Sequence, residues 1–114
     1  MDQRRLGPLD DPLDPFITKV YTRAEQAQAL AAPDPRRYYA ERFAAKEALF
    51  KALRISGEEV RLNEIETLND ETGAPFIRLY GALERKARKL GITAVHVSLS
   101  NDSPYSMAFV VCEK

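Results

Sequence analysis

The stretch Arg42-Phe43-Ala44-Ala45-Lys46-Glu47-Ala48-Leu49-Phe50-Lys51-Ala52-Leu53 decides the fold of this 114-residue chain. Alanine, leucine, lysine and glutamate favour helix, and the aromatic residues of the stretch fall on one side of a helix. Upstream, Asp34 followed by Pro35 is a typical helix start, because an aspartate caps the free N–H groups and a proline fits the first turn. We therefore expect one helix from Asp34 to about Leu53.

The charged residues of this helix allow two interpretations. Glu47 borders the apolar stripe, and Lys51 follows four residues later on the same side. Arg42 and Lys46 are also four apart, on another side. In the first interpretation, Glu47 and Lys51 form a stabilising pair, and the other basic side chains keep their charged ends in water. In the second, Glu47 offers a carboxylate to Mg²⁺ and the basic residues neutralise phosphate charge, which makes an anion and metal site.

The remaining sequence predicts an α+β fold, with helices packed on a mainly antiparallel sheet. Thr22 and Glu25 form a capping-box pattern, which is typical of a helix start. Turns are expected around Gly73 and over 101–104. The predicted elements are helices over 22–30, 34–53 and 81–90 and strands around 64–67, 76–80, 93–100 and 106–112.

Length and composition indicate a single globular domain. Seventeen basic and seventeen acidic residues give a net charge of zero, so no overall field draws the chain to nucleic acid or an anionic membrane. The single cysteine, Cys112, excludes an internal disulfide and fits a small apolar position in the last strand. Residues 1–15 hold three prolines and four aspartates, which predict an irregular arm before a domain over 16–114. Without a signal segment or an apolar run of membrane length, we expect a cytoplasmic protein.

The only histidine, His96, shares one face of a predicted strand with Ser98 and Ser100, and apolar residues alternate with them. A lone histidine is commonly structural, and three polar groups can also form a solvated sheet face. The serines lack the sharp turn of a nucleophile elbow, and the isolated glycines form no phosphate-binding loop. These residues alone therefore do not indicate a reaction.

Three motifs together are more specific. They are the stretch from Arg42 to Ala52, Asn63-Glu64-Ile65-Glu66 with Gly73-Ala74-Pro75, and His96-Val97-Ser98-Leu99-Ser100. In order and spacing they resemble the holo-acyl-carrier-protein synthases, the small single-domain branch of the 4′-phosphopantetheinyl transferases, over about residues 16–112. The resemblance implies that fold and the transfer of the phosphopantetheine arm of coenzyme A to a serine of an apo acyl carrier protein, with release of 3′,5′-ADP.

The resemblance also implies roles for single residues. Glu47 would hold Mg²⁺ and assist removal of the serine proton, and Lys51 would contact the diphosphate. Enzymes of this kind form trimers with the pocket between subunits, so His96 would serve the Glu47 of a neighbouring chain. The residues that would bind coenzyme A are Arg42, Lys46, Lys51, His96, Ser100 and Asn101.

The chain departs from the family at its start. Members begin with an apolar strand containing a Gly-x-Asp motif, whose aspartate is the other metal ligand, and a basic helix that docks the acidic carrier protein. Here Gly7-Pro8-Leu9-Asp10 is the nearest match, which makes Asp10, or its neighbour Asp11, the candidate second ligand. Two alternatives follow: a non-catalytic module that binds coenzyme A or a carrier protein, and a true start upstream of Met1.

Overall fold

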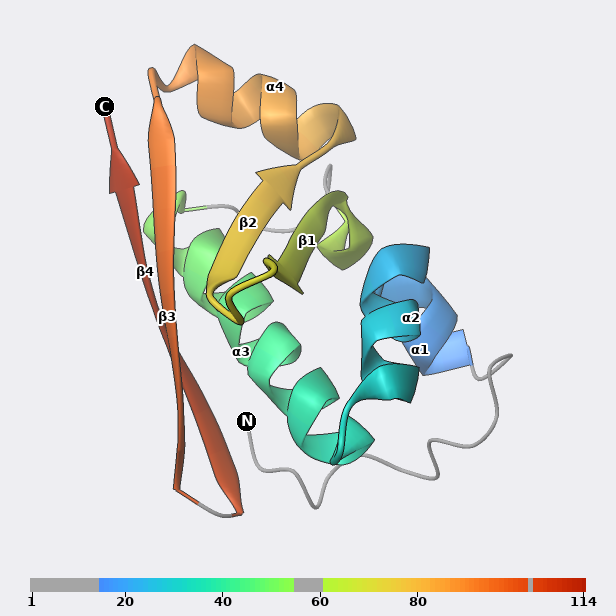
Figure 1. The fold of residues 1–114 in the computed structure, drawn as a ribbon. Helices are drawn as coiled ribbons and strands as arrows, with labels where there is room; N and C mark the ends of the chain where they lie inside the picture. The colour runs from blue at the N-terminus through green and yellow to red at the C-terminus, as the bar shows by residue number, and fades with distance from the viewer. Residues whose placement is uncertain (1–14, 55–60, 103) are drawn as a thin grey trace.

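The computed structural model describes residues 15–54, 61–102 and 104–114, and its fold is α+β, as predicted (Figure 1). Two short elements were not predicted, the helix α1 and the 3₁₀ turn η2. Pro15, the last residue of the expected arm, begins α1. The elements run α1 (Pro15–Val20), α2 (Arg23–Ala31), α3 (Pro35–Ala52), η2 (Leu62–Glu64), β1 (Ile65–Asn69), β2 (Pro75–Leu79), α4 (Gly81–Lys89), β3 (Ala94–Asp102) and β4 (Tyr105–Glu113).

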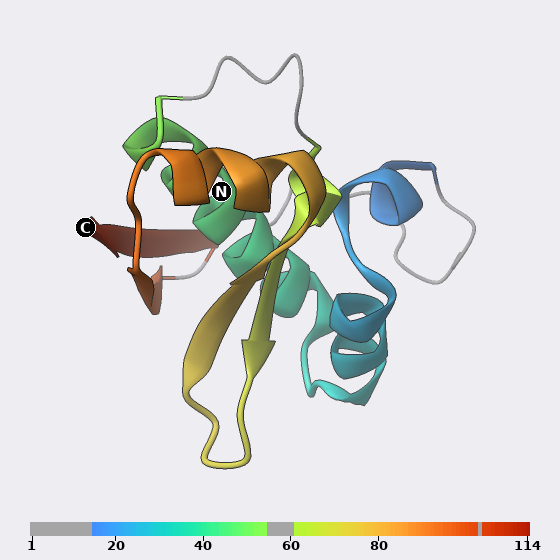
Figure 2. The ribbon, with the colours of Figure 1, turned by 90° about the horizontal axis from the view of Figure 1, so that it is seen from above.

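The long helix α3 is the central element of the molecule. Its first turn is capped as predicted, since the Asp34 carboxylate accepts a hydrogen bond from the backbone N–H of Arg37 at 3.2 Å. The helices α1 and α2 lie on one side of α3 and the β3–β4 hairpin on the other, in both views of the ribbon (Figures 1 and 2). The helix α3 therefore lies between the α1–α2 pair and the β3–β4 hairpin.

The strands form two separate two-stranded antiparallel sheets. In the first, β1 pairs with β2; in the second, β3 pairs with β4. The second hairpin is longer than predicted, because Asn101 and Asp102 continue β3 and pair with Ser106 and Tyr105 instead of forming the turn. The Ser106 hydroxyl reinforces this extension by donating a hydrogen bond to Asn101 Oδ1 at 2.7 Å.

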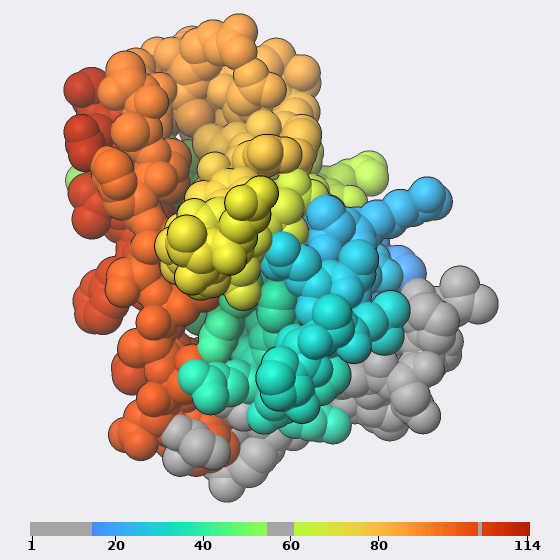
Figure 3. Space-filling view, in the orientation of Figure 1, coloured from blue at the N-terminus to red at the C-terminus, as the bar shows by residue number. Residues whose placement is uncertain are grey.

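The turn between β1 and β2 is centred on Gly73, whose φ of +86° lies in the left-handed region that glycine adopts without strain. The Asp70 carboxylate accepts hydrogen bonds from the Thr72 hydroxyl at 2.7 Å and from the backbone N–H of Ala74 at 3.0 Å. These hydrogen bonds hold the pKa of the Asp70 carboxyl below its ordinary value. In the space-filling view this turn, in yellow, lies on the surface between β3 and α2 (Figure 3).

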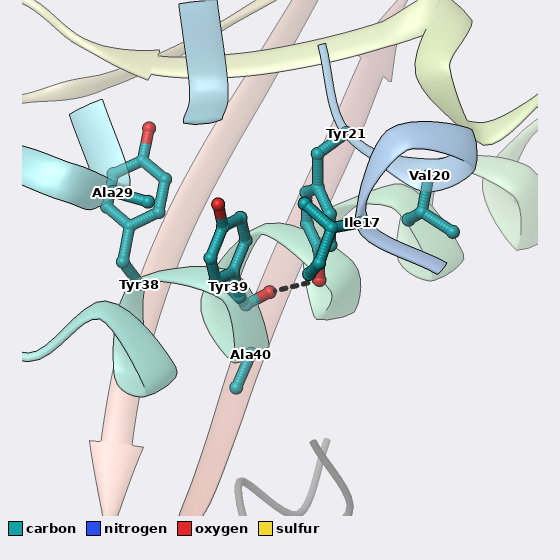
Figure 4. Close-up of a cluster of buried hydrophobic side chains, with 7 residues drawn as sticks. All are labelled: Ile17, Val20, Tyr21, Ala29, Tyr38, Tyr39 and Ala40. Atoms are coloured by element: carbon teal, nitrogen blue, oxygen red, sulfur yellow. Dashed lines mark hydrogen bonds between the residues drawn. The ribbon is translucent and has the colours of Figure 1, made fainter. Parts of the chain in front are cut away.

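The core consists of two clusters at the two ends of α3. The first joins the N-terminal half of α3 to α1 and α2, and in it the Tyr21 hydroxyl donates to the Tyr39 carbonyl at 2.7 Å (Figure 4). The second joins Leu49 and Leu53 to β1, α4 and the inner face of the β3–β4 hairpin, which includes Cys112 as expected. None of the helices in the described ranges has the length and apolar character that a membrane span requires.

Candidate functional site

Within the described ranges, the outer edge of β1 is covered by side chains and not by another strand. In its pairing with β2, this strand turns backbone groups of Ile65, Thr67 and Asn69 toward α2 and α3. An unpaired buried backbone group is costly, so each needs a partner. Four side chains, which we call the edge set, provide these partners: Glu25 and Gln28 from α2, and Arg42 and Lys46 from α3.

Lys46 is fully buried and uses all three of its N–H groups inside the molecule. Its Nζ donates to Glu25 Oε1 at 2.8 Å, to the Leu62 carbonyl at 3.1 Å and to the Ile65 carbonyl. Burial lowers the pKa of Lys46, and the negative charge of Glu25 opposes that effect. No N–H group of Lys46 remains for a phosphate in this arrangement, although the resemblance implies a contact with coenzyme A.

Arg42 is also buried, with 1% of its surface exposed. Its guanidinium donates to the Thr67 carbonyl at 3.1 Å, to Asn69 Oδ1 at 2.7 Å and to Glu41 Oε2 at 2.9 Å. It also stacks 3.9 Å from the centre of the Tyr38 ring. Arg42 therefore ties the N-terminal half of α3 to β1, and Lys46 ties the C-terminal half.

Glu47 and Lys51, by contrast, are exposed on α3. Both lie in the described part of the chain, where they form no ion pair with each other, so the stabilising pair of the first interpretation is absent. Because their neighbours Arg42 and Lys46 face β1, the motif has one side that holds the helix in place and one side that is open to a ligand.

A polar hollow of about 310 Å³ lies between α3, the β1–β2 turn and β3. A smaller hollow of about 220 Å³ adjoins it at the start of α3 and shares Arg37, Glu41 and Asn69 with it. The larger hollow is lined by Arg37, Glu41, Asn69, Gly73, Pro75, Val97, Ser98, Leu99 and Asn101.

Glu41 lines both hollows and binds two arginine side chains there. Its carboxylate accepts hydrogen bonds from Arg37 at 3.1 Å and from Arg42 at 2.9 Å, and it also contacts the Asn101 amide. Asn101, a predicted ligand residue, is thus fixed between Glu41 and Ser106. Sequence reasoning did not single out Arg37, whose side chain is 55% exposed, because an arginine near a helix start has no pattern that separates a ligand from a solvated residue.

His96 and Ser100 lie on the outer face of the β3–β4 hairpin, as the alternating pattern predicted. His96 contacts the Glu113 carboxylate there, and both side chains are more than half exposed. The opposite face of the hairpin packs on the second core cluster with Leu49 of α3. Within one chain, His96 therefore lies on the face of the hairpin that points away from α3.

A magnesium site made only of protein ligands is not present in the described ranges, which contain no group of three or more His, Cys, Asp or Glu side chains able to hold a metal ion. The donor set nevertheless fits Mg²⁺, because this ion is commonly held by one or two carboxylates plus water and substrate phosphate. Glu47 supplies one exposed carboxylate. The other candidate ligand, Asp10, lies outside the described residues.

Comparison with known proteins identifies the family. The model of the 4′-phosphopantetheinyl transferase superfamily matches residues 3–110. The holo-[acyl-carrier-protein] synthase of Cronobacter sakazakii is 39% identical over 104 residues, covering 88% of this chain and 80% of that protein. The fatty acid synthase subunit alpha of Schizosaccharomyces pombe is 38% identical over 101 residues, which are 87% of this chain but only 6% of that subunit.

Solved structures agree with this assignment. The holo-[acyl-carrier-protein] synthase of Neisseria meningitidis superposes with a TM-score of 0.78 at 36% identity, covering 87% of this chain and 80% of that one. The Helicobacter pylori synthase in complex with coenzyme A superposes with a TM-score of 0.74 at 27% identity, covering 86% of this chain and 81% of that one. Because the family model spans nearly the whole chain and the fold agrees, the chain is a transferase of the 4′-phosphopantetheinyl transferase superfamily, related to the holo-acyl-carrier-protein synthases.

Proposed function

We propose that this chain transfers 4′-phosphopantetheine from coenzyme A to a serine of an apo acyl carrier protein, with Mg²⁺ and with release of 3′,5′-ADP. The observation that carries the proposal is the division of the α3 motif. Arg42 and Lys46 are buried and hold α3 on β1, while Glu47 and Lys51 remain exposed. Relatives named as holo-[acyl-carrier-protein] synthases, and one solved with coenzyme A, support this activity.

The reaction forms a bond between the serine oxygen and the phosphorus that carries pantetheine. The bond from that phosphorus to the bridging oxygen breaks, and its electron pair leaves with 3′,5′-ADP. The serine proton must be taken up as the new bond forms, and we assign this role to Glu47, whose carboxylate is exposed on α3. Lys51, one turn further along, stabilises negative charge on the diphosphate. A magnesium ion held by Glu47 would neutralise phosphate charge when bound.

The nucleotide end of coenzyme A fits the polar hollow beside the start of α3. Arg37 supplies an exposed guanidinium there, and Asn101 supplies an amide. Arg42 lines the adjoining hollow, where it adds positive charge through the guanidinium hydrogens that its three hydrogen bonds leave over. Lys46 has no contact with coenzyme A in this proposal.

The outer face of the β3–β4 hairpin is proposed to contact other copies of the chain in a homotrimer. Four large apolar side chains alternate along β4 on this face, beside His96 and Ser100, and each is about half exposed or more. A second copy packed here would bring its own α3 toward His96 and Ser100. The four side chains are Tyr105, Met107, Phe109 and Val111.

The first test is intact-mass spectrometry of an apo acyl carrier protein incubated with this protein, coenzyme A and Mg²⁺. We expect a gain of one phosphopantetheine arm, which is lost without metal. Glu47→Gln should slow the transfer about 100-fold or more, because the variant can neither bind metal nor accept a proton as the carboxylate does. Lys51→Ala should slow it without a matching loss of stability.

Glu84→Gln is the matched control, because Glu84 lies on α4 and pairs with Arg88 at the surface. It should transfer at the wild-type rate. If the wild type transfers nothing while an authentic family enzyme modifies the same carrier, the proposed activity is wrong. Calorimetry with coenzyme A then tests the non-catalytic binding module. Wild-type rates in Glu47→Gln would exclude the role given to that carboxylate.

A further inference from the structure

Glu25 links three elements through one carboxylate. It stands in the first turn of α2, where its Oε1 accepts the backbone N–H of Thr22 at 2.9 Å. The same oxygen accepts the ammonium of Lys46 on α3 at 2.8 Å. Its Oε2 accepts the backbone N–H of Thr67 on β1 at 3.0 Å. Since Glu25 is 0% exposed, water cannot replace any of these contacts without opening the core.

Within the edge set, the contact to Lys46 is the one nearest the exposed half of the motif. Lys46 directly precedes Glu47, and Lys51 follows just over one turn later. The other tether of α3, Arg42, acts one turn earlier and on Thr67 and Asn69. The Lys46 tether therefore acts together with the packing of Leu49 and Leu53 in setting the position of Glu47 relative to β1.

We propose that Glu25 is a positioning residue for phosphopantetheine transfer, which it serves by fixing Lys46 and hence the stretch of α3 that carries Glu47 and Lys51. This inference rests on the proposed function for its kinetic part. Glu25 itself touches neither substrate, because it is buried between α2, α3 and β1. Its effect passes through the placement of α3.

Glutamine cannot replace Glu25 without a conflict. A glutamine offers one accepting oxygen and one donating NH₂ group, whereas all three neighbours of the carboxylate are donors: the Thr22 N–H and Lys46 at Oε1, and the Thr67 N–H at Oε2. In Glu25→Gln the NH₂ group must therefore face either the Thr67 N–H or both the Thr22 N–H and Lys46. In either orientation the buried ammonium of Lys46 loses its negatively charged partner, so we expect the turn of α3 at Lys46 to move away from β1.

The experiment compares Glu25→Gln with Glu66→Gln in steady-state transfer. Glu66 is buried on β1 and makes side-chain hydrogen bonds to Thr22 at 2.7 Å and Tyr80 at 2.9 Å. Among the described residues it makes no hydrogen bond to α3, and its charge acts on Lys46 less than that of Glu25 does. Both variants should lower the melting temperature. In Glu25→Gln we expect kcat to fall tenfold or more and KM for coenzyme A to stay within twofold, because the hollow that binds the nucleotide lies nearer Arg42. In Glu66→Gln we expect both constants within twofold of wild type.

Hydrogen exchange provides a readout that needs no activity. Amides of residues 47–52 should exchange at least tenfold faster in Glu25→Gln, and at the wild-type rate in Glu66→Gln, below the melting temperature of each protein. If the wild type has no transferase activity, the proposed function fails and this measurement alone decides whether Glu25 fixes α3.

Three results would overturn the inference: a kcat retained in folded Glu25→Gln, a change confined to KM, or an equal fall of kcat in Glu66→Gln. With an inactive wild type, unchanged exchange at 47–52 would overturn it. If Glu25→Gln does not fold, Glu25→Asp takes its place, since it keeps the charge and shortens the reach by one methylene. In Glu25→Asp we likewise expect kcat to fall while KM for coenzyme A stays within twofold of wild type.

Discussion

At the scale of single residues, adjacent positions of α3 differ in burial: Lys46 is fully buried, whereas Glu47 is exposed. The sequence predicted that Arg42 and Lys46 lie on a different side of the helix from Glu47, and this is confirmed. It did not predict which side is buried, because lysine and arginine are almost always exposed unless they are paired. Their partners, Glu25 and the edge of β1, lie about 20 or more residues away in sequence, where no local pattern reveals them.

The buried Thr67 hydroxyl leads to a prediction about stability. Both backbone groups of Thr67 are bonded within the edge set, but its Oγ1 has no hydrogen-bond partner in the described part of the chain, although the residue is fully buried. A buried hydroxyl without a partner is costly, and valine has nearly the same shape. We expect Thr67→Val to leave the free energy of unfolding unchanged or to raise it by about 1 kcal/mol, measured by urea denaturation.

Thr22→Val is the matched control for this prediction. The Thr22 hydroxyl accepts the backbone N–H of Glu25 at 3.1 Å and donates to Glu66 at 2.7 Å. The same substitution should therefore lower the free energy of unfolding by about 1 kcal/mol or more, as loss of a helix cap does. A loss of that size in Thr67→Val as well would show that its hydroxyl is satisfied, for example by an ordered water molecule.

At the scale of elements, the first five residues of β4, 105–109, have large side chains on the outer face and small ones on the inner face. Ser106 is fully buried and Ala108 is partly buried on the face toward α3, where small side chains let the strand approach the helix closely. Phe109 and Val111 point outward and are 73% and 59% exposed. The sequence predicted the strand, but it did not predict this inversion, because large apolar residues are normally assigned to the buried face.

The inversion predicts self-association through the outer face of the hairpin. Several large apolar side chains exposed next to one another on one face are typical of an interface. We expect light scattering to give about three times the 12.9 kDa chain mass for the wild type, and Phe109→Glu to shift it toward the monomer because a charge would be buried at the contact. Leu30→Glu is the control, since Leu30 is 82% exposed on α2 and should leave the mass unchanged. A wild type that is monomeric at all concentrations would contradict the homotrimer.

At the scale of the whole molecule, periodicity predicted the order of the main elements, while their packing depended on contacts that are distant in sequence. The capping box at Thr22 and the turn at Gly73 are local signals, and both are confirmed. Among the described residues, the first sheet ends at β1 because side chains such as Arg42 take the place of a third strand there. Backbone pairing by a side chain has no sequence period, so it could not be predicted.

The first core cluster gives the whole molecule a predicted sensitivity to alkali. Burial raises the pKa of Tyr38 to about 12, while the Arg42 guanidinium against its ring acts in the opposite direction. Burial also raises the pKa of the Tyr21 and Tyr39 hydroxyls. The unfolded chain loses these protons near the ordinary value of 10.0, before the folded chain does. Stability that is present below pH 10 must therefore fall as the pH rises from about 10 toward 12.

Tyr38→Phe isolates one contribution to this fall. At pH 8 the difference in free energy of unfolding between wild type and variant measures the lost hydrogen bond from Tyr38 to Gln28, which is 2.8 Å long. Phenylalanine has no proton to lose, so the unfolding curve of the variant depends less steeply on pH above 10. In urea denaturation we expect the difference in free energy of unfolding between wild type and Tyr38→Phe to become smaller between pH 10 and 11.5. A difference that stays constant over this range would mean that the Tyr38 hydroxyl titrates alike in the folded and unfolded chain, and that the first cluster admits water to it.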